Sequence, residues 1–330
     1  MSVTWCHRMN KQIIENWYQA CFLKIACNGG VKMPESKVEV NRENPSKMAE
    51  GMAMHRFGES AKPEDERICY DPYAVHFINP EYIEFGIKHP EEAKARIEAM
   101  EKIFVGLSSS VVARVRYFDD FTEKSIDDGT EQLVILGAGY DTRAYRIERL
   151  KNIKVFEVDH PNTQSFKIQK IKEAFDSVPD HVVYVPVDFE KETFGQKLFD
   201  EGYNSSKKTL FIMEGLSMYI PPKAVAETLL FIVENSGKGS HVIFDYYPES
   251  VVDGTCNLEI GKNIRNFLIQ QGEPLQFGIK EEKIQDFLTE FGFSGIQNVT
   301  SEDYKTLYFH GKNENRNVCE LLYFAHAVVE

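Results

Sequence analysis

The sequence predicts an α/β protein built on a mainly parallel sheet with helices on both faces. Three observations predict this class. Short apolar runs alternate with helix-length stretches through the second half of the chain. The first of these runs meets a glycine-rich turn and then a helix, in "LVILGAGYDTRAYR". A helix and two further strand-like runs follow the last of them. Strands that alternate with helices require crossover connections, and these cover both faces of a parallel sheet.

The N-terminal part of the 330-residue chain differs from the rest. Residues 1–47 contain both tryptophans and half of the six cysteines, and they end in a polar stretch. We expect a helical or loosely ordered extension there, and a single domain over residues 48–330. Within this domain, residues 48–128 predict a helical cap. The stretch "HPEEAKARIEAMEKIFVGL" has a proline at its start and early glutamates that suit a helix N-terminus. "SSSVVARVRYFDDFTEKSI" predicts a further helix, and the core then begins at residue 129.

Strands of the core are predicted at five short apolar runs, Leu133–Leu136, Val155–Val158, Val182–Val187, Thr209–Met213 and His241–Phe244. After the fifth run, "KEEKIQDFLTEFGF" predicts an amphipathic helix that ends at a glycine. Strands are then expected around residues 296–299 and within "CELLYFAHAVV". A helix followed by a late strand pair resembles the end of the Rossmann-like, seven-stranded sheet of class I methyltransferases. Architecture of this kind indicates a fold and assigns no function.

The composition argues against several classes of partner. The formal net charge is −13 at pH 7, and proteins that bind nucleic acids or anionic membranes carry basic surfaces instead. No apolar run reaches the roughly 18 residues of a membrane span, and "ACFLKIAC" is too short and interrupted for a signal peptide. The cysteines are scattered, with no C-x-x-C pair and no zinc-type spacing. We therefore expect a cytoplasmic protein with free thiols and no metal.

The turn Gly137-Ala138-Gly139 predicts a nucleotide-like cofactor at the start of the following helix. A triphosphate-binding loop would need a lysine after its last glycine, and none follows here. A dinucleotide fingerprint needs a third glycine or alanine, and Thr142 stands in that place. The match to a dinucleotide site is therefore partial. A tight strand-to-helix turn without any ligand is the remaining alternative.

Acidic residues at other predicted strand ends support a ligand. Asp159 ends the second strand, about 20 residues beyond the glycines, where a carboxylate can accept both hydroxyls of a ribose. This geometry serves NAD and S-adenosylmethionine alike, and the alternative role of Asp159 is to cap the next helix. Glu214 and Tyr219 follow the fourth strand at the same carboxyl edge. The alternative for Glu214 is a solvated or structurally paired carboxylate.

Five stretches carry a family resemblance: "RVRYFDDF", "VILGAGYDTRAYR", "FEVDHPNTQSFK", "VPVDFEKETF" and "LFIMEGLSMYIPP". In this order and spacing they resemble the leucine carboxyl methyltransferase family, from about Met48 to the C-terminus. The resemblance implies a Rossmann-like methyltransferase fold and S-adenosylmethionine as cofactor, with S-adenosylhomocysteine as product.

The resemblance also implies roles for single residues at the cofactor. Arg114 would pair with the methionine carboxylate of S-adenosylmethionine. Gly137 and Gly139 would form the turn that approaches the cofactor closely, and Asp159 would hold the ribose. Arg116 competes with Arg114, because the two lie two residues apart and helical periodicity does not decide between them.

Three more residues receive roles from the resemblance. Asp188 would bind the adenine amine while Phe189 covers the ring, and Glu214 would make a further cofactor or pocket contact. Arg143 and Tyr145, in the helix after the glycine turn, are candidates for a structural role instead. An arginine at that place often pairs with acids on a neighbouring strand.

The motif "GAGYDTRAYR" resembles that of the microbial branch of the family. This branch includes O-methyltransferases of the tetracenomycin type in polyketide synthesis. A small-molecule acceptor is therefore expected, and a protein C-terminal carboxylate is the alternative. A carboxylate is already nucleophilic at pH 7, so alignment and exclusion of water are the main tasks and no general base is required. A hydroxyl acceptor would benefit from a base, and Tyr219, His160 and Glu214 are then the candidates, with Tyr219 also a candidate wall of the acceptor pocket.

Two other functions share parts of this pattern. An NAD(P)-dependent dehydrogenase would use the same glycine turn and Asp159, but it should also show a third glycine and a proton-relay residue. A non-catalytic binding protein on a methyltransferase scaffold would have lost cofactor residues that this sequence retains. The sequence leaves the oligomeric state open.

Overall fold

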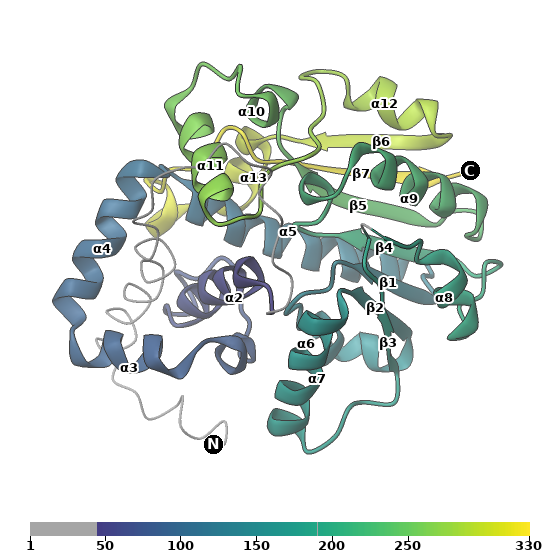
Figure 1. The fold of residues 1–330 in the computed structure, drawn as a ribbon, viewed down its shortest axis with the longest axis horizontal. Helices are drawn as coiled ribbons and strands as arrows, with labels where there is room; N and C mark the ends of the chain where they lie inside the picture. Colours follow the sequence, from purple (N-terminus) through teal and green to yellow (C-terminus); the bar gives the residue numbers. More distant parts are fainter. Residues whose placement is uncertain (1–44, 190) are drawn as a thin grey trace.

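A seven-stranded sheet runs through the centre of the computed structural model, which describes residues 45–189 and 191–330 (Figure 1). The strands follow the order β3-β2-β1-β4-β5-β7-β6. Neighbours from β3 to β5 are parallel, and β7 runs antiparallel to both β5 and β6. The prediction of a mainly parallel α/β sheet is thereby confirmed. The strands are β1 Gln132–Leu136, β2 Lys154–Asp159, β3 Val182–Pro186, β4 Thr209–Met213, β5 His241–Tyr246, β6 Phe293–Val299 and β7 Tyr323–Val329.

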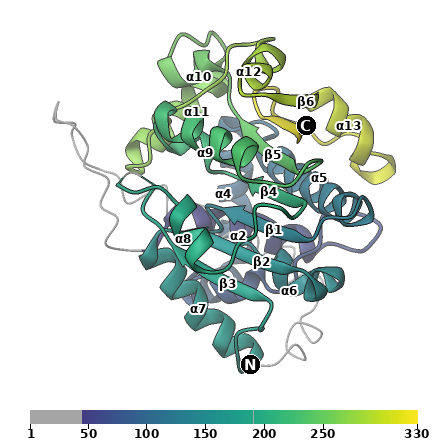
Figure 2. The same cartoon turned by 90° about the vertical axis from the view of Figure 1, so that its right-hand side faces the viewer.

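Helices cover both faces of this sheet (Figure 2). Alternate residues of β1 belong to two separate apolar cores, Leu133 and Ile135 to one, Val134 and Leu136 to the other. The first core includes residues of α2, α5, α7 and α13, and the second includes residues of α8, α9 and α12. The helices are α2 Lys47–Ser60, α3 Pro80–Lys88, α4 Pro90–Ile103, α5 Leu107–Asp127, α6 Arg143–Arg146, α7 Pro161–Phe175, α8 Gly195–Asp200, α9 Pro222–Glu234, α10 Glu249–Asp253, α11 Glu259–Gln270, α12 Ile284–Glu290 and α13 Ser301–Tyr308.

Helices α4 and α5 begin where their sequence signals predict, but α4 ends at Ile103, before the end of the predicted stretch at Leu107. Helix α4 starts at Pro90 and carries two glutamates in its first turn. Helix α5 follows Gly106, which has φ 73°. A Cβ atom at Gly106 would lie 2.4 Å from the backbone of Val318, so this close approach requires glycine. The extension expected over residues 1–47 lies, up to residue 44, outside the described residues.

Helix α2 crosses the carboxyl edge of the sheet. The strand order reverses between β1 and β4, and open α/β sheets bind ligands at the carboxyl ends of strands at such a point. Arg56 of α2 donates from Nη2 to the carbonyl oxygen of Tyr140 at 2.6 Å. The N–H of Ser46 donates to Oγ1 of Thr163 at 3.3 Å. These contacts fix α2 over the turn that follows β1.

Two further facts concern membranes and metals. None of the helices in residues 45–189 and 191–330 is long and apolar enough to span a bilayer. The same residues contain no group of three or more histidine, cysteine or acidic side chains placed to hold a metal ion. Cys69, Cys256 and Cys319 are buried free thiols.

Candidate active site

A cavity of about 600 Å³ opens at the carboxyl edge of the sheet, beneath α2. Eight of the residues singled out from the sequence line it, namely Arg114, Gly137, Gly139, Arg143, Asp159, His160, Glu214 and Tyr219. Residues of α2, α5 and α11 line it as well. Asp188 and Phe189 are not among the lining residues. The structure therefore brings most of the predicted site together around one cavity.

The glycine turn after β1 depends on backbone conformations that favour glycine. Gly137 has φ 66° and Gly139 has φ 44°. The N–H of Gly137 donates to the carbonyl oxygen of Val158 in β2 at 2.8 Å, which ties the turn to the neighbouring strand. A Cβ atom at Gly137 would lie 2.9 Å from the side chain of Leu216. Both the backbone and the packing therefore require glycine at this position.

Replacing Gly137 with alanine is expected to lower the free energy of unfolding more than the same change at Gly129. Gly129 also has a positive φ, 89°, but no atom lies within 4 Å of its Cβ position. Gly129→Ala should therefore cost only the left-handed backbone term, roughly 1–2 kcal/mol, whereas Gly137→Ala also forces Leu216 to move. Urea denaturation of both variants measures the difference. Equal decreases in the free energy of unfolding would show that the contact with Leu216 does not contribute to the effect.

Asp159 joins the glycine turn to the end of β2. Its Oδ2 accepts a hydrogen bond from the N–H of Gly139, and its Oδ1 accepts one from the N–H of His160 at 2.6 Å. Burial raises the pKa of Asp159, while these two backbone donors oppose the shift. Helix α7 is capped by the side chain of His160, which accepts from the N–H of Asn162, so Asp159 is not the capping residue. Its remaining lone pairs can accept further hydrogen bonds at the cavity.

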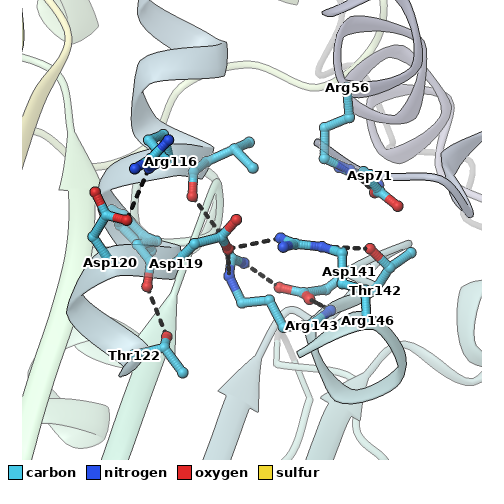
Figure 3. A network of polar contacts seen from close by, with 12 residues as sticks. Arg56, Asp71, Arg116, Asp119, Asp120, Thr122, Asp141, Thr142, Arg143 and Arg146 are labelled. Atoms are coloured by element: carbon cyan, nitrogen blue, oxygen red, sulfur yellow. Dashed lines mark hydrogen bonds and ion pairs between the residues drawn. The ribbon is translucent and has the colours of Figure 1, made fainter. Parts of the chain in front are cut away.

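Arg114 is buried in the cavity wall, and its three nitrogen atoms have partners of different strength. Nε donates to Glu214 Oε1 at 3.1 Å, and Nη1 donates to Asp245. Nη2 meets only the thioether sulfur of Met52, at 3.3 Å, among its hydrogen bonds to the described residues. A thioether is a weak acceptor, so Nη2 is the donor that an incoming carboxylate would take. Arg116 points to the surface instead, where it pairs with Asp120 at 2.8 Å (Figure 3).

A buried ionic network supports this wall from behind. Arg143 is 2% exposed and pairs through Nε with Asp119 at 2.8 Å and through Nη1 with Glu214 at 2.7 Å. Arg143 Nη1 also pairs with Asp141, and Arg146 reaches Asp119 at 2.6 Å (Figure 3). Burial alone would raise the pKa of Asp141, but the charge of Arg143 outweighs it and holds that pKa at about 2.

The network decides two of the alternatives left by the sequence. Arg143 pairs with acids of three neighbouring segments, as the structural interpretation predicts. Tyr145 likewise makes an internal contact, a 2.7 Å hydrogen bond between its hydroxyl and that of Tyr184. Glu214 is a paired carboxylate held by two arginines, and it lines the cavity at the same time.

Asp188 and Phe189 lie beyond His160, which does line the cavity. Asp188 Oδ2 is 2.8 Å from Lys191 Nζ and 3.8 Å from His160 Nε2. The ring of Phe189 packs against Phe194, with centroids 6.0 Å apart. The adenine role that the resemblance implies for this pair stays a prediction.

Three lining or supporting residues are absent from the sequence-based site. Asp245 is fully buried in β5, and an acid within the apolar run "HVIFDYY" was a usable signal, because such an acid needs a buried cation. His55 of α2 forms a 3.1 Å hydrogen bond between Nδ1 and Ser108 Oγ. Burial, together with the charges of Arg114 and Arg56, lowers the pKa of His55 to about 3.

The third is Tyr247, which is 7% exposed and lines the cavity directly after β5. No signal in the sequence separates it from Tyr246, its neighbour in the chain. Tyr246 turns to the other core, where its hydroxyl donates to Asn298 Oδ1 at 2.9 Å.

Sequence comparison shows the family to which the chain belongs. Residues 49–233, more than half of the chain, match the family model described as leucine carboxyl methyltransferase. A Bacillus subtilis (strain 168) protein named "Putative S-adenosyl-L-methionine-dependent methyltransferase YktD" is 29% identical over 255 residues, 77% of this chain and 82% of that protein. A similarly named Mycobacterium marinum (strain ATCC BAA-535 / M) protein is 35% identical over 145 residues, 43% of this chain and 47% of the relative.

Solved structures share the fold at low sequence identity. A DUF574 family protein from Streptomyces avermitilis MA-4680 has a TM-score of 0.53 at 12% identity, covering 73% of this chain and 91% of its own. A protein from Thermobifida fusca YX, described as a "putative methyltransferase", has a TM-score of 0.53 at 13% identity, covering 73% and 89%. The likeness concerns the fold alone, and it confirms the predicted Rossmann-like class of sheet.

Proposed function

Because this chain belongs to the leucine carboxyl methyltransferase family, we propose that it is an S-adenosylmethionine-dependent O-methyltransferase that methylates the carboxylate of a small apolar molecule. One observation carries this proposal. A single cavity joins the glycine turn and Asp159, at the edge where nucleoside cofactors bind, to an apolar end under α11. Cofactor and acceptor can therefore meet in one enclosed space.

The residues at the first end fit the cofactor. Gly139 lines the cavity and has no side chain, so its backbone can be approached closely by the ligand. Asp159 can accept the ribose hydroxyls, and Arg114 Nη2 can take the methionine carboxylate in place of the thioether of Met52. When bound, S-adenosylmethionine supplies a methyl group already activated on a sulfonium. The chain's own task is to hold the ligands in line and to exclude water.

The other end of the cavity fits an apolar acceptor. Phe104 and Phe267 meet edge to face with ring centroids 5.3 Å apart, and Ile264 and Leu268 lie beside them in the lining. Ligand pockets of about 300–1,000 Å³ suit small molecules, and this cavity falls in that range with its about 600 Å³. An apolar body with a carboxylate directed at the cofactor would satisfy both parts of the lining.

The ionisable groups in the cavity favour a carboxylate over a hydroxyl acceptor. The pKa of His55 is lowered to about 3, so it takes up a proton poorly at neutral pH. Glu214 is held by Arg114 and Arg143. Burial raises the pKa of Tyr219 well above its usual value, so its hydroxyl stays protonated. A carboxylate needs no base and is matched to this set of groups.

The experiment is a methyl-transfer assay with radiolabelled S-adenosylmethionine. The acceptors are decanoate and phenylacetate, the corresponding alcohols, and a peptide with a C-terminal leucine. Transfer to the two acids, as base-labile methyl esters, is the expected result. Transfer to the alcohols alone would contradict the carboxylate proposal, and transfer to the peptide alone would move the acceptor to protein C-termini.

The rate of methyl transfer is expected to be independent of pH between pH 6 and 8. The reason is that a small carboxylic acid is ionised throughout this range, and His55, with a pKa of about 3, is neutral throughout it. The measurement is kcat with saturating decanoate in constant-ionic-strength buffers. A tenfold rise of kcat per pH unit in this window would reveal a group that must lose a proton, as a hydroxyl acceptor requires.

A further inference from the structure

Three tyrosines that line the cavity, Tyr140, Tyr219 and Tyr247, have hydroxyls without a hydrogen-bond partner among residues 45–189 and 191–330. Two of these hydroxyls, those of Tyr219 and Tyr247, belong to segments that follow the neighbouring strands β4 and β5. Buried tyrosines usually find a partner for the hydroxyl. Two buried tyrosines away from the cavity do so, since Tyr304 donates to Ser110 at 2.8 Å and Tyr203 to the carbonyl of Asn235 at 2.7 Å. Tyr247 is buried and Tyr219 partly buried. The two cavity hydroxyls are therefore donors that lack an acceptor.

Both tyrosines stand on supported backbone at the carboxyl edge. Tyr219 ends the short helix η4 (Ser217–Tyr219) after β4, and Tyr247 follows β5, the parallel neighbour of β4. Ser217 Oγ donates to the carbonyl of Asp245 at 2.6 Å, which joins the two segments. Gln276 Nε2 donates to the carbonyl of Tyr219 at 2.7 Å, and the N–H of Ile279 to that of Tyr247 at 3.2 Å. The segment from 276 to 279 thus fixes both residues.

The electrostatics keep both hydroxyls protonated. Burial raises the pKa of Tyr219 well above its usual value, and Glu273 and Asp245 add to the shift. Burial also raises the pKa of Tyr247, with Tyr219 as the next cause. Both residues line the cavity, and the hydrogen bond from Ser217 to Asp245 joins the segments that carry them, so we place them in one corner of the cavity. That corner offers neutral O–H donors, which suit an anionic oxygen.

We propose that the hydroxyls of Tyr219 and Tyr247 bind the carboxylate of the acceptor and position it for methyl transfer. This inference rests on the proposed function and names the residues that recognise the acceptor. In the transfer, a carboxylate oxygen forms the new O–C bond, and the electron pair of the broken S–C bond stays on sulfur. No proton leaves or reaches either tyrosine. The product ester has lost the negative charge, so the two donors hold it less strongly than the acid.

The test measures binding to the complex of the full chain with S-adenosylhomocysteine, by calorimetric titration with decanoate and with methyl decanoate. The wild type is expected to bind the acid more tightly than the ester. Tyr219→Phe and Tyr247→Phe should each weaken acid binding by about tenfold or more, since each removes one hydrogen bond to a charged group. Ester binding should change little, and KM for decanoate should rise more than kcat falls.

The matched control is Tyr246→Phe. It removes the hydroxyl of the adjacent tyrosine, which donates to Asn298 away from the cavity, and should leave acid binding unchanged. Binding of S-adenosylhomocysteine by every variant confirms an intact fold.

Acid binding at the wild-type level in both cavity variants would overturn the proposal. If the wild type methylates decanol and not decanoate, the carboxylate assignment fails. The tyrosine pair is then judged on decanol, where an unchanged kcat/KM in Tyr247→Phe overturns it. A wild-type complex that binds neither acid nor alcohol overturns it as well.

Discussion

Asp159→Ala is expected to abolish measurable binding of S-adenosylhomocysteine. The variant would lose the two proposed hydrogen bonds from the ribose to a charged acceptor, each worth about 1.5–3 kcal/mol. Together these correspond to roughly a hundredfold or greater loss of affinity. The same carboxylate accepts the N–H groups of Gly139 and His160, so the glycine turn also loses one of its contacts with the end of β2, although the backbone hydrogen bond from Gly137 to Val158 remains. Both effects act in the same direction.

Calorimetric titration with S-adenosylmethionine and S-adenosylhomocysteine measures this loss, with NAD and NADP as controls on the wild type. Asp159→Asn keeps one acceptor oxygen and the shape of the side chain, and an intermediate affinity is expected. Wild-type affinity in Asp159→Ala would place the ribose elsewhere. Binding of NAD, and of neither adenosyl ligand, would favour the dehydrogenase alternative. Binding of no ligand by the wild type would favour a scaffold protein without a cofactor.

Arg143→Met is expected to lower the free energy of unfolding by about 3–5 kcal/mol, the usual cost of removing one partner from a buried ionic cluster. Methionine keeps an apolar stem in the core but leaves Asp119, Asp141 and Glu214 without their shared cation. Uncompensated carboxylates in a buried site must either stay charged at high cost or take up protons. Urea denaturation at pH 7 measures the change.

Arg149→Met is the matched control for this variant. Arg149 pairs with Glu123 at 3.0 Å and with Asp127 at 2.7 Å, but all three side chains are exposed. Such surface pairs contribute little, so its unfolding midpoint should stay near that of the wild type. Equal midpoints for Arg143→Met and Arg149→Met would show that the buried network does not stabilise the fold.

The strands and helix starts could be predicted because their signals are local. β4 has the predicted bounds, and the structure shifts the ends of β1, β2 and β5 by one or two residues. The glycine turn could be predicted for the same reason. Gly137 and Gly139 have positive φ, a backbone conformation that few residues other than glycine adopt.

Other parts of the site depend on contacts between distant segments, which one sequence does not display. Arg114 meets Asp245 across 131 positions. Whether Arg114 or Arg116 faces the cavity depends on how α5 packs against the sheet. His55 lies there because α2 crosses the carboxyl edge, and Tyr247 because β5 ends next to η4. Asp188 and Phe189 have the predicted place after β3, yet the cavity does not extend to them.

The ionic network behind the cavity also has a net charge. Three arginines, Arg114, Arg143 and Arg146, face four carboxylates, Asp119, Asp141, Glu214 and Asp245. The cluster therefore carries one surplus negative charge. S-adenosylmethionine carries one net positive charge at neutral pH, and the thioether left after transfer carries none. Under the proposed function, the surplus negative charge would favour the cationic S-adenosylmethionine over the neutral S-adenosylhomocysteine.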